Sequence, residues 1–226
     1  MPRRVGGDVA GIVYHAMNRA IAGLTLFKDQ GDYGAFEGIL QEAWQREPIR
    51  ILSYTVMPNH WHMVLLPTRG GQMASFLRWL SVTHAKRWHA YRGTAGSGHL
   101  YQGPFKSFPV ATDEYFLTAC RYVERNALAA GLVRKAQDWR WSSLWRRLRG
   151  DADAKAILSP WPEEPTENWL EWVNTPLTDR ELEAMQASIR RGRPFGSLQW
   201  QEEMAAKLGC EHTLRSRGRP MKTCGR

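Results

Sequence analysis

The 226-residue sequence contains few cysteines and no long apolar run, and both absences narrow its class. Its three cysteines are widely spaced and odd in number, which excludes a disulfide framework or a zinc knuckle as the basis of the fold. The sequence has no stretch of about 18 apolar residues, no apolar signal segment after its basic start and no solenoid repeat. We therefore expect a cytoplasmic protein without membrane contact.

Positive charge is abundant and unevenly distributed along the chain. The net charge is +9, with 20 basic and 10 acidic residues in 1–150, 2 and 9 in 151–189, and 9 and 3 in 190–226. Two basic blocks separated by an acidic one favour a polyanionic partner such as nucleic acid. A solvated basic surface without a special partner explains the charge equally well, so charge alone does not decide.

The spacing of apolar residues predicts alternating strands and helices in residues 9–130. Pro48 is expected to end the first helix, and Gly131 the last one, for which Thr112 is the expected N-terminal cap. Strands are expected at 9–18, 49–56 and 60–66 with a mostly extended stretch at 101–110, and helices at 30–46, 72–91 and 112–130.

This order of elements is typical of a ferredoxin-like split βαβ unit. Such a unit is an α+β fold, and we expect an antiparallel sheet with its helices on one face. Composition suggests three regions: a main domain at 1–150, an acidic proline-containing linker at 151–180 and a helical basic tail at 181–226. Within the tail, residues 197–208 are expected to form a short capped helix.

His60 and His62 are separated by one residue on an expected strand, so their side chains point to the same face of the sheet. Neutral imidazole is the commonest metal ligand in proteins, and the pair predicts a divalent-metal site. A closed zinc site requires four protein ligands. His84 falls on an apolar helical stripe and is expected in the core, whereas His15 on the first strand could approach the pair.

Tyr122 and Asn126 are neighbours one helical turn apart, on a stripe that lies beside the apolar stripe of the 112–130 helix. A phenol and an amide in this position can face a functional site. A half-buried tyrosine next to a hydrogen-bonded asparagine, with no functional role, is the alternative interpretation.

Five sequence strings occur in a specific order and spacing: MPNHWH at 57–62, GHLYQG at 98–103, RYVERN at 121–126, WRWSSL at 139–144 and RGRP at 217–220. Taken together, they resemble the REP-associated tyrosine transposases, within the single-tyrosine HUH transposase superfamily. The resemblance covers nearly the whole chain.

The resemblance implies a metal-dependent single-strand DNA endonuclease and strand transferase that acts at REP-like hairpins. It implies that His60, His62 and Asn126 bind Mg²⁺ or Mn²⁺, and that Tyr122 forms a 5′-phosphotyrosine intermediate. The implied partners are single-stranded DNA and DNA hairpins, and a location at the nucleoid follows. A monomer and a homodimer are both compatible with the sequence.

Two other functions are compatible with parts of the pattern. One is a DNA-hairpin-binding protein with reduced or lost catalytic turnover. The other is an unrelated zinc hydrolase, which ranks last because no His-Glu-x-x-His string is present and Tyr122 would have no role.

The chain departs from the family pattern in two of its motifs. Members usually read Asn-Pro-x-Arg-Ala after the tyrosine, where this chain has Ala127 and Ala129 in place of the proline and the arginine. Members usually read Gly-Arg-Phe-Lys where this chain has Pro104 in place of the arginine. Both missing arginines could contact DNA, so the departures bear on affinity or specificity more than on chemistry.

Basic residues in three regions are candidates for DNA contact, each with a solvent-exposed cation as the alternative. The tryptophans of the 139–145 region are expected to pack in the core rather than stack on bases. The string Arg-Gly-Arg-Pro occurs twice, and its shape is similar to the core of a minor-groove-binding AT-hook. The candidates are Lys86, Arg87, Lys106, Arg146, Arg147, Arg149, Arg191, Arg193, Arg217 and Arg219.

Overall fold

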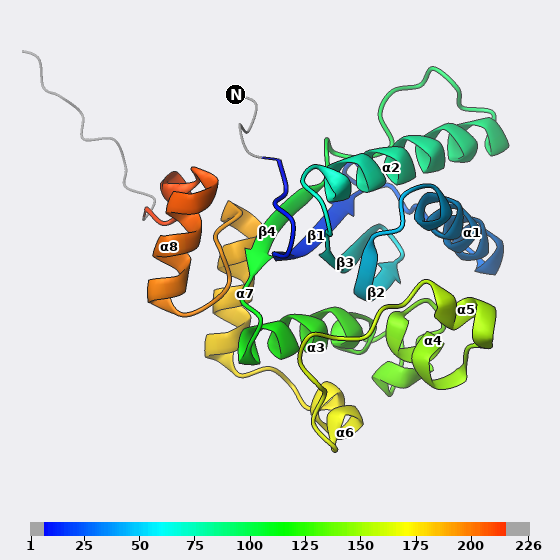
Figure 1. Cartoon of the computed structure of the whole chain (residues 1–226). Coiled ribbons are helices and arrows are strands. Elements are labelled where there is room, and N and C mark those ends of the chain that lie inside the picture. The colour runs from blue at the N-terminus through cyan, green and yellow to red at the C-terminus, as the bar shows by residue number, and fades with distance from the viewer. Residues whose placement is uncertain (1–6, 216–226) are drawn as a thin grey trace, which may run out of the picture.

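Four antiparallel strands form one sheet at the centre of the molecule, as seen in a computed structural model that describes residues 7–215 (Figure 1). The spatial order is β2-β3-β1-β4, with β1 paired to both β3 and β4. This order is that of a ferredoxin-like sheet, and the predicted α+β fold is confirmed. The strands are β1 (Val13–Arg19), β2 (Arg50–Met57), β3 (His60–Leu66) and β4 (Lys106–Val110).

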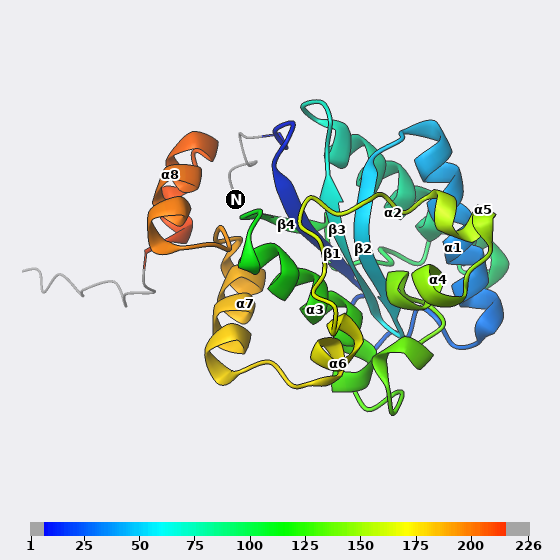
Figure 2. The same ribbon diagram turned by 60° about the horizontal axis from the view of Figure 1, so that its bottom comes forward.

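Helices cover both faces of the sheet, which corrects the expectation of a one-sided arrangement. Helices α1 (Gln30–Arg46) and α2 (Gln72–Tyr91) lie on one face, and α3 (Glu114–Ala129) lies on the other (Figures 1 and 2). The remaining helices are η1 (Ala136–Asp138), α4 (Ser143–Arg149), α5 (Ala152–Ala156), α6 (Trp169–Asn174), α7 (Asp179–Arg191), α8 (Leu198–Leu208) and η2 (Glu211–Thr213).

Alternation along β3 explains why both faces of the sheet need cover. Trp61 and Met63 are buried in the core under α1 and α2, whereas Val64 is buried in a second core with residues of α3. Because side chains alternate across a strand, His60 and His62 share the α3 face with Val64. The register therefore directs the histidine pair toward α3.

The turn that precedes the histidine pair is held by backbone hydrogen bonds. The amides of Leu26 and Phe27 donate to the carbonyl of Pro58 at 2.8 and 3.1 Å, and the amide of Ala20 donates to the carbonyl of Asn59 at 2.9 Å. The hairpin between β2 and β3 is thus fixed to the end of β1, which limits movement of His60.

Several predicted boundaries shift in the structure. The first strand begins at Val13 rather than at residue 9, and the extended stretch becomes a strand only at Lys106. Asp113, not Thr112, caps α3, because its carboxylate accepts a hydrogen bond from the amide of Tyr115 at 3.0 Å. The Gly131 stop is confirmed by its positive φ of 70° just beyond the helix.

The acidic segment 151–180 packs against the main domain instead of running free. It contains α5 and α6, and Trp169 and Val173 are buried in the core on the α3 face. Further along, Phe195 pairs with β4, donating to the carbonyl of Pro109 and accepting from the amide of Ala111, both at 2.9 Å. The division of the chain at residues 150 and 180 stays a prediction.

Within residues 7–215, no helix is long and apolar enough to cross a membrane.

Candidate metal and nucleophile site

The structure brings His60, His62, Tyr122 and Asn126 together between β3 and α3. The ring centroids of His60 and His62 are 4.9 Å apart, and the ring of Tyr122 meets that of His62 edge-on at 5.7 Å. Asn126 lies one turn after Tyr122 on the same helix. Residues from two sequence regions that the prediction joined are thus neighbours in space.

The amide of Asn126 bridges the two halves of the site through side-chain hydrogen bonds. Burial, with a smaller contribution from Arg19, lowers the pKa of His60 to about 4, whereas the hydrogen bond with Asn126 opposes this shift. Burial raises the pKa of the Tyr122 phenol, and its hydrogen bond with Asn126 acts in the opposite direction. Asn126 therefore contacts both a histidine and the phenol.

Both histidines of the pair are neutral near pH 7. Burial lowers the pKa of His62 well below its ordinary value, with further contributions from His15 and His60. A neutral imidazole has one unprotonated nitrogen with a lone pair, which is the form that binds metal ions.

One nitrogen of each ring is already engaged by the protein. The Nδ1 of His60 donates to Oδ1 of Asn59 at 2.7 Å, because an amide oxygen only accepts. The Nδ1 of His62 lies 3.0 Å from Nε2 of His15. Such outer contacts orient metal-binding histidines. In His60 the contact leaves Nε2 available to a ligand, whereas in His62 the availability of Nε2 depends on which ring donates the proton.

The donor set of the site is incomplete without an amide. Among the described residues 7–215, no group of three or more His, Cys, Asp or Glu side chains could hold a metal ion. Two imidazole nitrogens and the oxygen of Asn126 would form an open, three-ligand set. Such a set leaves room for a substrate oxygen, unlike a closed structural zinc site.

A cation that the sequence interpretation missed lies beside the pair. Arg19 on β1 is directly opposite His60 in the sheet register, is exposed, and lowers the pKa of both His60 and His62. Its guanidinium has no hydrogen-bond or ion-pair partner within residues 7–215. Only the pairing of β1 with β3 reveals this neighbour, because the sequence of one strand does not determine which residue of another strand lies opposite.

Lys106 lies on the same face of the sheet as the histidine pair. It is opposite Met17, which is in turn opposite His62, and Phe108 two residues later faces the α3 core. Its side chain is exposed. The structure is thus compatible with the phosphate contact that the sequence suggests for Lys106.

Two of the other candidate cations flank the site in sequence but not in space. Lys86 and Arg87 lie on α2, which covers the opposite face of the sheet. Arg87 forms a two-bond ion pair with Glu42 at 2.6 and 2.7 Å. Both residues therefore lie away from the His60–Tyr122 site, and their contact with DNA stays a prediction.

The cations of α4 serve mostly structural roles. Arg146 is only 5% exposed, pairs with Glu37 at 3.0 Å and donates to the carbonyl of Ala154, so the expected phosphate contact is wrong for this residue. Arg147 donates to two carbonyl groups, of Leu52 and Ser159. Arg149 is exposed and pairs with Asp138 at 3.1 Å.

The first Arg-Gly-Arg-Pro copy terminates a helix. Gly192 adopts a left-handed conformation with φ of 71° at the end of α7, and Pro194 is buried. Arg191 is exposed and donates to the carbonyl of Arg215, while Arg193 binds the side chain of Gln201. This copy is folded rather than extended. Arg217 and Arg219 lie outside the described residues.

The expected structural roles of several aromatic residues and of His84 are confirmed. Trp139 donates to the carbonyl of Val56 at 3.0 Å, and Trp141 stacks on Tyr33 at 4.9 Å. His84 is buried and its Nδ1 lies 2.7 Å from the hydroxyl of Tyr101.

A buried carboxylate fixes α3 from its inner side. Glu124 accepts hydrogen bonds from Ser143 at 2.8 Å, from the indole of Trp169 at 3.0 Å and from Ser53 at 3.4 Å. These donors belong to α4, α6 and β2. The position of Tyr122, two residues earlier, thus depends on three other elements.

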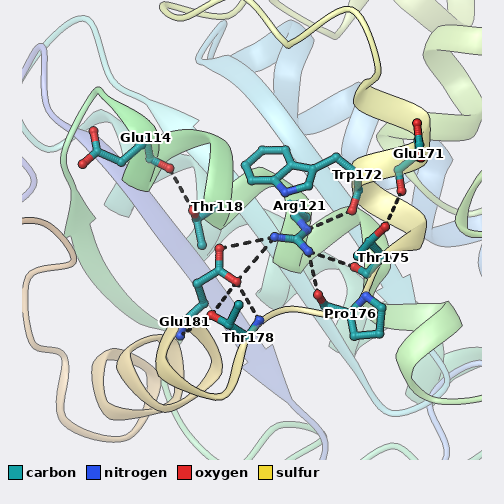
Figure 3. A network of polar contacts seen from close by, with 9 residues as sticks. All are labelled: Glu114, Thr118, Arg121, Glu171, Trp172, Thr175, Pro176, Thr178 and Glu181. Carbon is teal, nitrogen blue, oxygen red and sulfur yellow. Dashed lines mark hydrogen bonds and ion pairs between the residues drawn. The ribbon is translucent and has the colours of Figure 1, made fainter.

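A buried arginine fixes α3 from its outer side (Figure 3). The guanidinium of Arg121 donates to the carbonyls of Trp172, Thr175 and Pro176 at 2.7 to 3.0 Å, and reaches Glu181 at 3.3 Å. It also lies over the ring of Trp172 at 4.6 Å. Arg121 therefore connects the segment between α6 and α7 to α3, the helix that carries Tyr122.

The fold and the site together define a class of protein: a ferredoxin-like domain that presents a His-x-His strand to a helix with tyrosine and asparagine one turn apart. The family model described as "Transposase IS200 like" matches residues 8–126, a span that contains all four site residues. The chain belongs to the IS200-like transposase family.

Solved structures support the fold. A structure of the REP-associated tyrosine transposase bound to a REP hairpin is similar with a TM-score of 0.55 and 18% identity, over 79% of this chain and 94% of that chain. Two weaker similarities have TM-scores too low to support an argument. One is to a Deinococcus radiodurans structure provisionally described as a transposase (0.38, 15% identity, 58% and 95% covered), the other to tRNA(His) guanylyltransferase from Saccharomyces cerevisiae (0.37, 10% identity, 72% and 85% covered). No curated protein matches the chain.

Proposed function

We propose that the protein is a metal-dependent single-strand DNA endonuclease and strand transferase that acts at REP-like hairpins through a 5′-phosphotyrosine intermediate. The observation that carries the proposal is the convergence of His60, His62 and Asn126 beside the Tyr122 phenol. Family membership and the likeness to a transposase bound to a REP hairpin support it.

The residues that would hold a divalent cation are His60 and His62, through Nε2, and Asn126, through its amide oxygen. Nitrogen and oxygen donors in this ratio suit Mn²⁺, and Mg²⁺ binds with more of its own waters. When bound, the cation supplies Lewis-acid polarisation of a non-bridging phosphate oxygen. The protein contributes two neutral imidazoles held by Asn59 and His15.

Tyr122 is the proposed nucleophile. Its oxygen forms a bond to phosphorus while the bond from phosphorus to the 3′ oxygen breaks, and the phenol proton is balanced by the proton gained at the 3′-hydroxyl. One phosphodiester replaces another, so the strand can be rejoined without ATP. Burial raises the pKa of the phenol and makes it harder to ionise, whereas the hydrogen bond with Asn126 favours the phenolate.

The cations on the α3 face would contact the DNA backbone near the cut. Arg19 and Lys106 are exposed on this face: Arg19 follows Met17 by two residues on β1, and Lys106 lies opposite Met17 on β4. Phosphate contacts of this kind supply affinity without sequence information.

A hairpin oligonucleotide with a single-stranded flank and Mg²⁺ or Mn²⁺ tests the proposal. We expect wild-type protein to cleave it and to form a protein–DNA adduct that survives denaturing gels. Tyr122→Phe should bind the hairpin but form no adduct. Tyr115→Phe is the matched control, because Tyr115 lies on the same helix but packs against Phe195. Unchanged cleavage by Tyr122→Phe would contradict the mechanism.

A hairpin-binding protein with reduced turnover is the second candidate function. Ala129 and Pro104, which replace the usual arginines, are both exposed, so these replacements remove surface charge without disturbing the core. Hairpin binding without cleavage in any divalent metal would favour this function.

A further inference from the structure

A third histidine lies buried beside the pair, and the proposed chemistry does not yet use it. His15 comes from β1, is fully buried, and contacts His62 through a 3.0 Å approach of its Nε2 to Nδ1 of His62. Its ring packs against Phe108 at 4.8 Å and meets the edge of Tyr122 at 6.3 Å. It therefore touches two of the proposed site residues.

The direction of this hydrogen bond decides whether His62 can be a ligand. Two neutral imidazoles share a single proton in such a contact. If His62 Nδ1 donates to His15 Nε2, the lone pair of His62 Nε2 is free. If His15 donates instead, the proton of His62 is on Nε2, and that nitrogen cannot bind a metal ion.

Packing alone does not explain an imidazole at position 15. The Nδ1 of His15 is buried and has no hydrogen-bond partner within residues 7–215. An apolar ring would fill the same space without an unsatisfied polar atom. Among residues 7–215, the contact with His62 is the one hydrogen bond of the His15 ring, and it explains why a histidine occupies this position.

We propose that His15 is a positioning residue that accepts the Nδ1 proton of His62 and so keeps His62 Nε2 free for a divalent cation. The inference rests on the proposed function, because it concerns the same metal site. Asn59 serves His60 in the same way, with an oxygen that can only accept. His15 thus completes a pair of outer contacts that fix both rings.

Mn²⁺ binding by the DNA-free protein, followed by electron paramagnetic resonance, tests the proposal. His15→Phe keeps a ring but removes the acceptor, and we expect it to weaken Mn²⁺ binding about 10- to 100-fold. His15→Gln supplies an amide acceptor and should recover part of the loss. His84→Phe is the control, because His84 is also buried and bonded through one nitrogen, but to Tyr101 outside the site. It should leave Mn²⁺ affinity within about twofold of wild type, below the range for an outer-contact residue.

A second measurement needs no variant and guards against loss of folding in His15→Phe. Long-range ¹H–¹⁵N spectra of wild-type protein with labelled histidine should show His62 protonated on Nδ1 and unprotonated on Nε2. Equal Mn²⁺ affinity of folded His15→Phe and wild type, or a proton on Nε2 of His62, would overturn the proposal and leave the proposed function standing. Wild-type protein that binds no Mn²⁺ would contradict the proposed metal site, while the spectra would still decide the direction of the bond.

Discussion

Replacing Glu124 probes how the fold holds the helix that presents Tyr122. Glu124→Ala removes the acceptor for Ser143, Trp169 and Ser53, all of which are buried or packed against the same core. Because the two serine hydroxyls also bond to each other at 3.1 Å, the indole of Trp169 and one serine hydroxyl lose their acceptor, at about 1 kcal/mol or more each, and the lost side chain leaves a cavity. We expect the free energy of unfolding to fall by about 3 to 5 kcal/mol, a large part of the 5–15 kcal/mol that is usual for a domain.

Urea unfolding followed by tryptophan fluorescence measures this loss. Glu124→Gln keeps the shape of the side chain and one acceptor oxygen, but its NH₂ group faces one of the donors that the carboxylate accepted from. We therefore expect Glu124→Gln to lower the free energy of unfolding by about 1 to 2 kcal/mol. Glu114→Ala is the matched control on the exposed start of the same helix, where the helix-dipole contribution is about 0.3 to 1 kcal/mol. An unfolding free energy of Glu124→Ala within about 1 kcal/mol of wild type would refute the view that this network anchors α3.

Arg19→Ala should reduce hairpin cleavage about tenfold and make cleavage less dependent on salt concentration. Arg87→Ala should have neither effect, because Arg87 is paired with Glu42 on the other face of the sheet. Equal effects of the two variants in cleavage assays would contradict the placement of Arg19 near the DNA. Arg121→Ala should lower the unfolding free energy by about 2 to 4 kcal/mol and expose the α6–α7 segment to protease, as urea titration and limited proteolysis would show; an unchanged cleavage pattern would contradict the clamp. Burial raises the pKa of Glu124 from 4.5, so the native protein holds the proton of this carboxyl more tightly than the unfolded protein does. The free energy of unfolding of wild type, relative to that of Glu124→Gln, should therefore decline as the pH rises above 4.5. Parallel pH profiles of the two unfolding free energies would contradict this.

Elements with strong periodicity and clear end signals were predictable from the sequence. The predicted helix bounds 30–46 and 72–91 and the strand 60–66 agree with the structure, because proline, glycine and apolar spacing act locally. The four central site residues were also predictable, since each pair sits within five residues of chain. Their joining depended on the family resemblance.

Features that depend on strand register or on distant partners were not predictable. The position of Arg19 follows from the pairing of β1 with β3, which places it opposite His60. The sequence suggested that His15 could approach the pair, but only the folded structure shows its contact with His62. The burial of Arg146 follows from its pairing with Glu37 on α1, far away in the chain. The sequence alone does not show whether an arginine binds DNA or pairs with a buried carboxylate. Only the folded structure distinguishes these two roles.

Mapping the covalent adduct tests the central claim most directly. Wild-type protein is incubated with a hairpin oligonucleotide and Mn²⁺, digested, and analysed by mass spectrometry. The account predicts a nucleotide linked through its 5′ phosphate to the peptide that contains Tyr122, with no such product after EDTA treatment or in Tyr122→Phe. A nucleotide linked to another residue, or cleavage of the hairpin without any linked peptide, would contradict it.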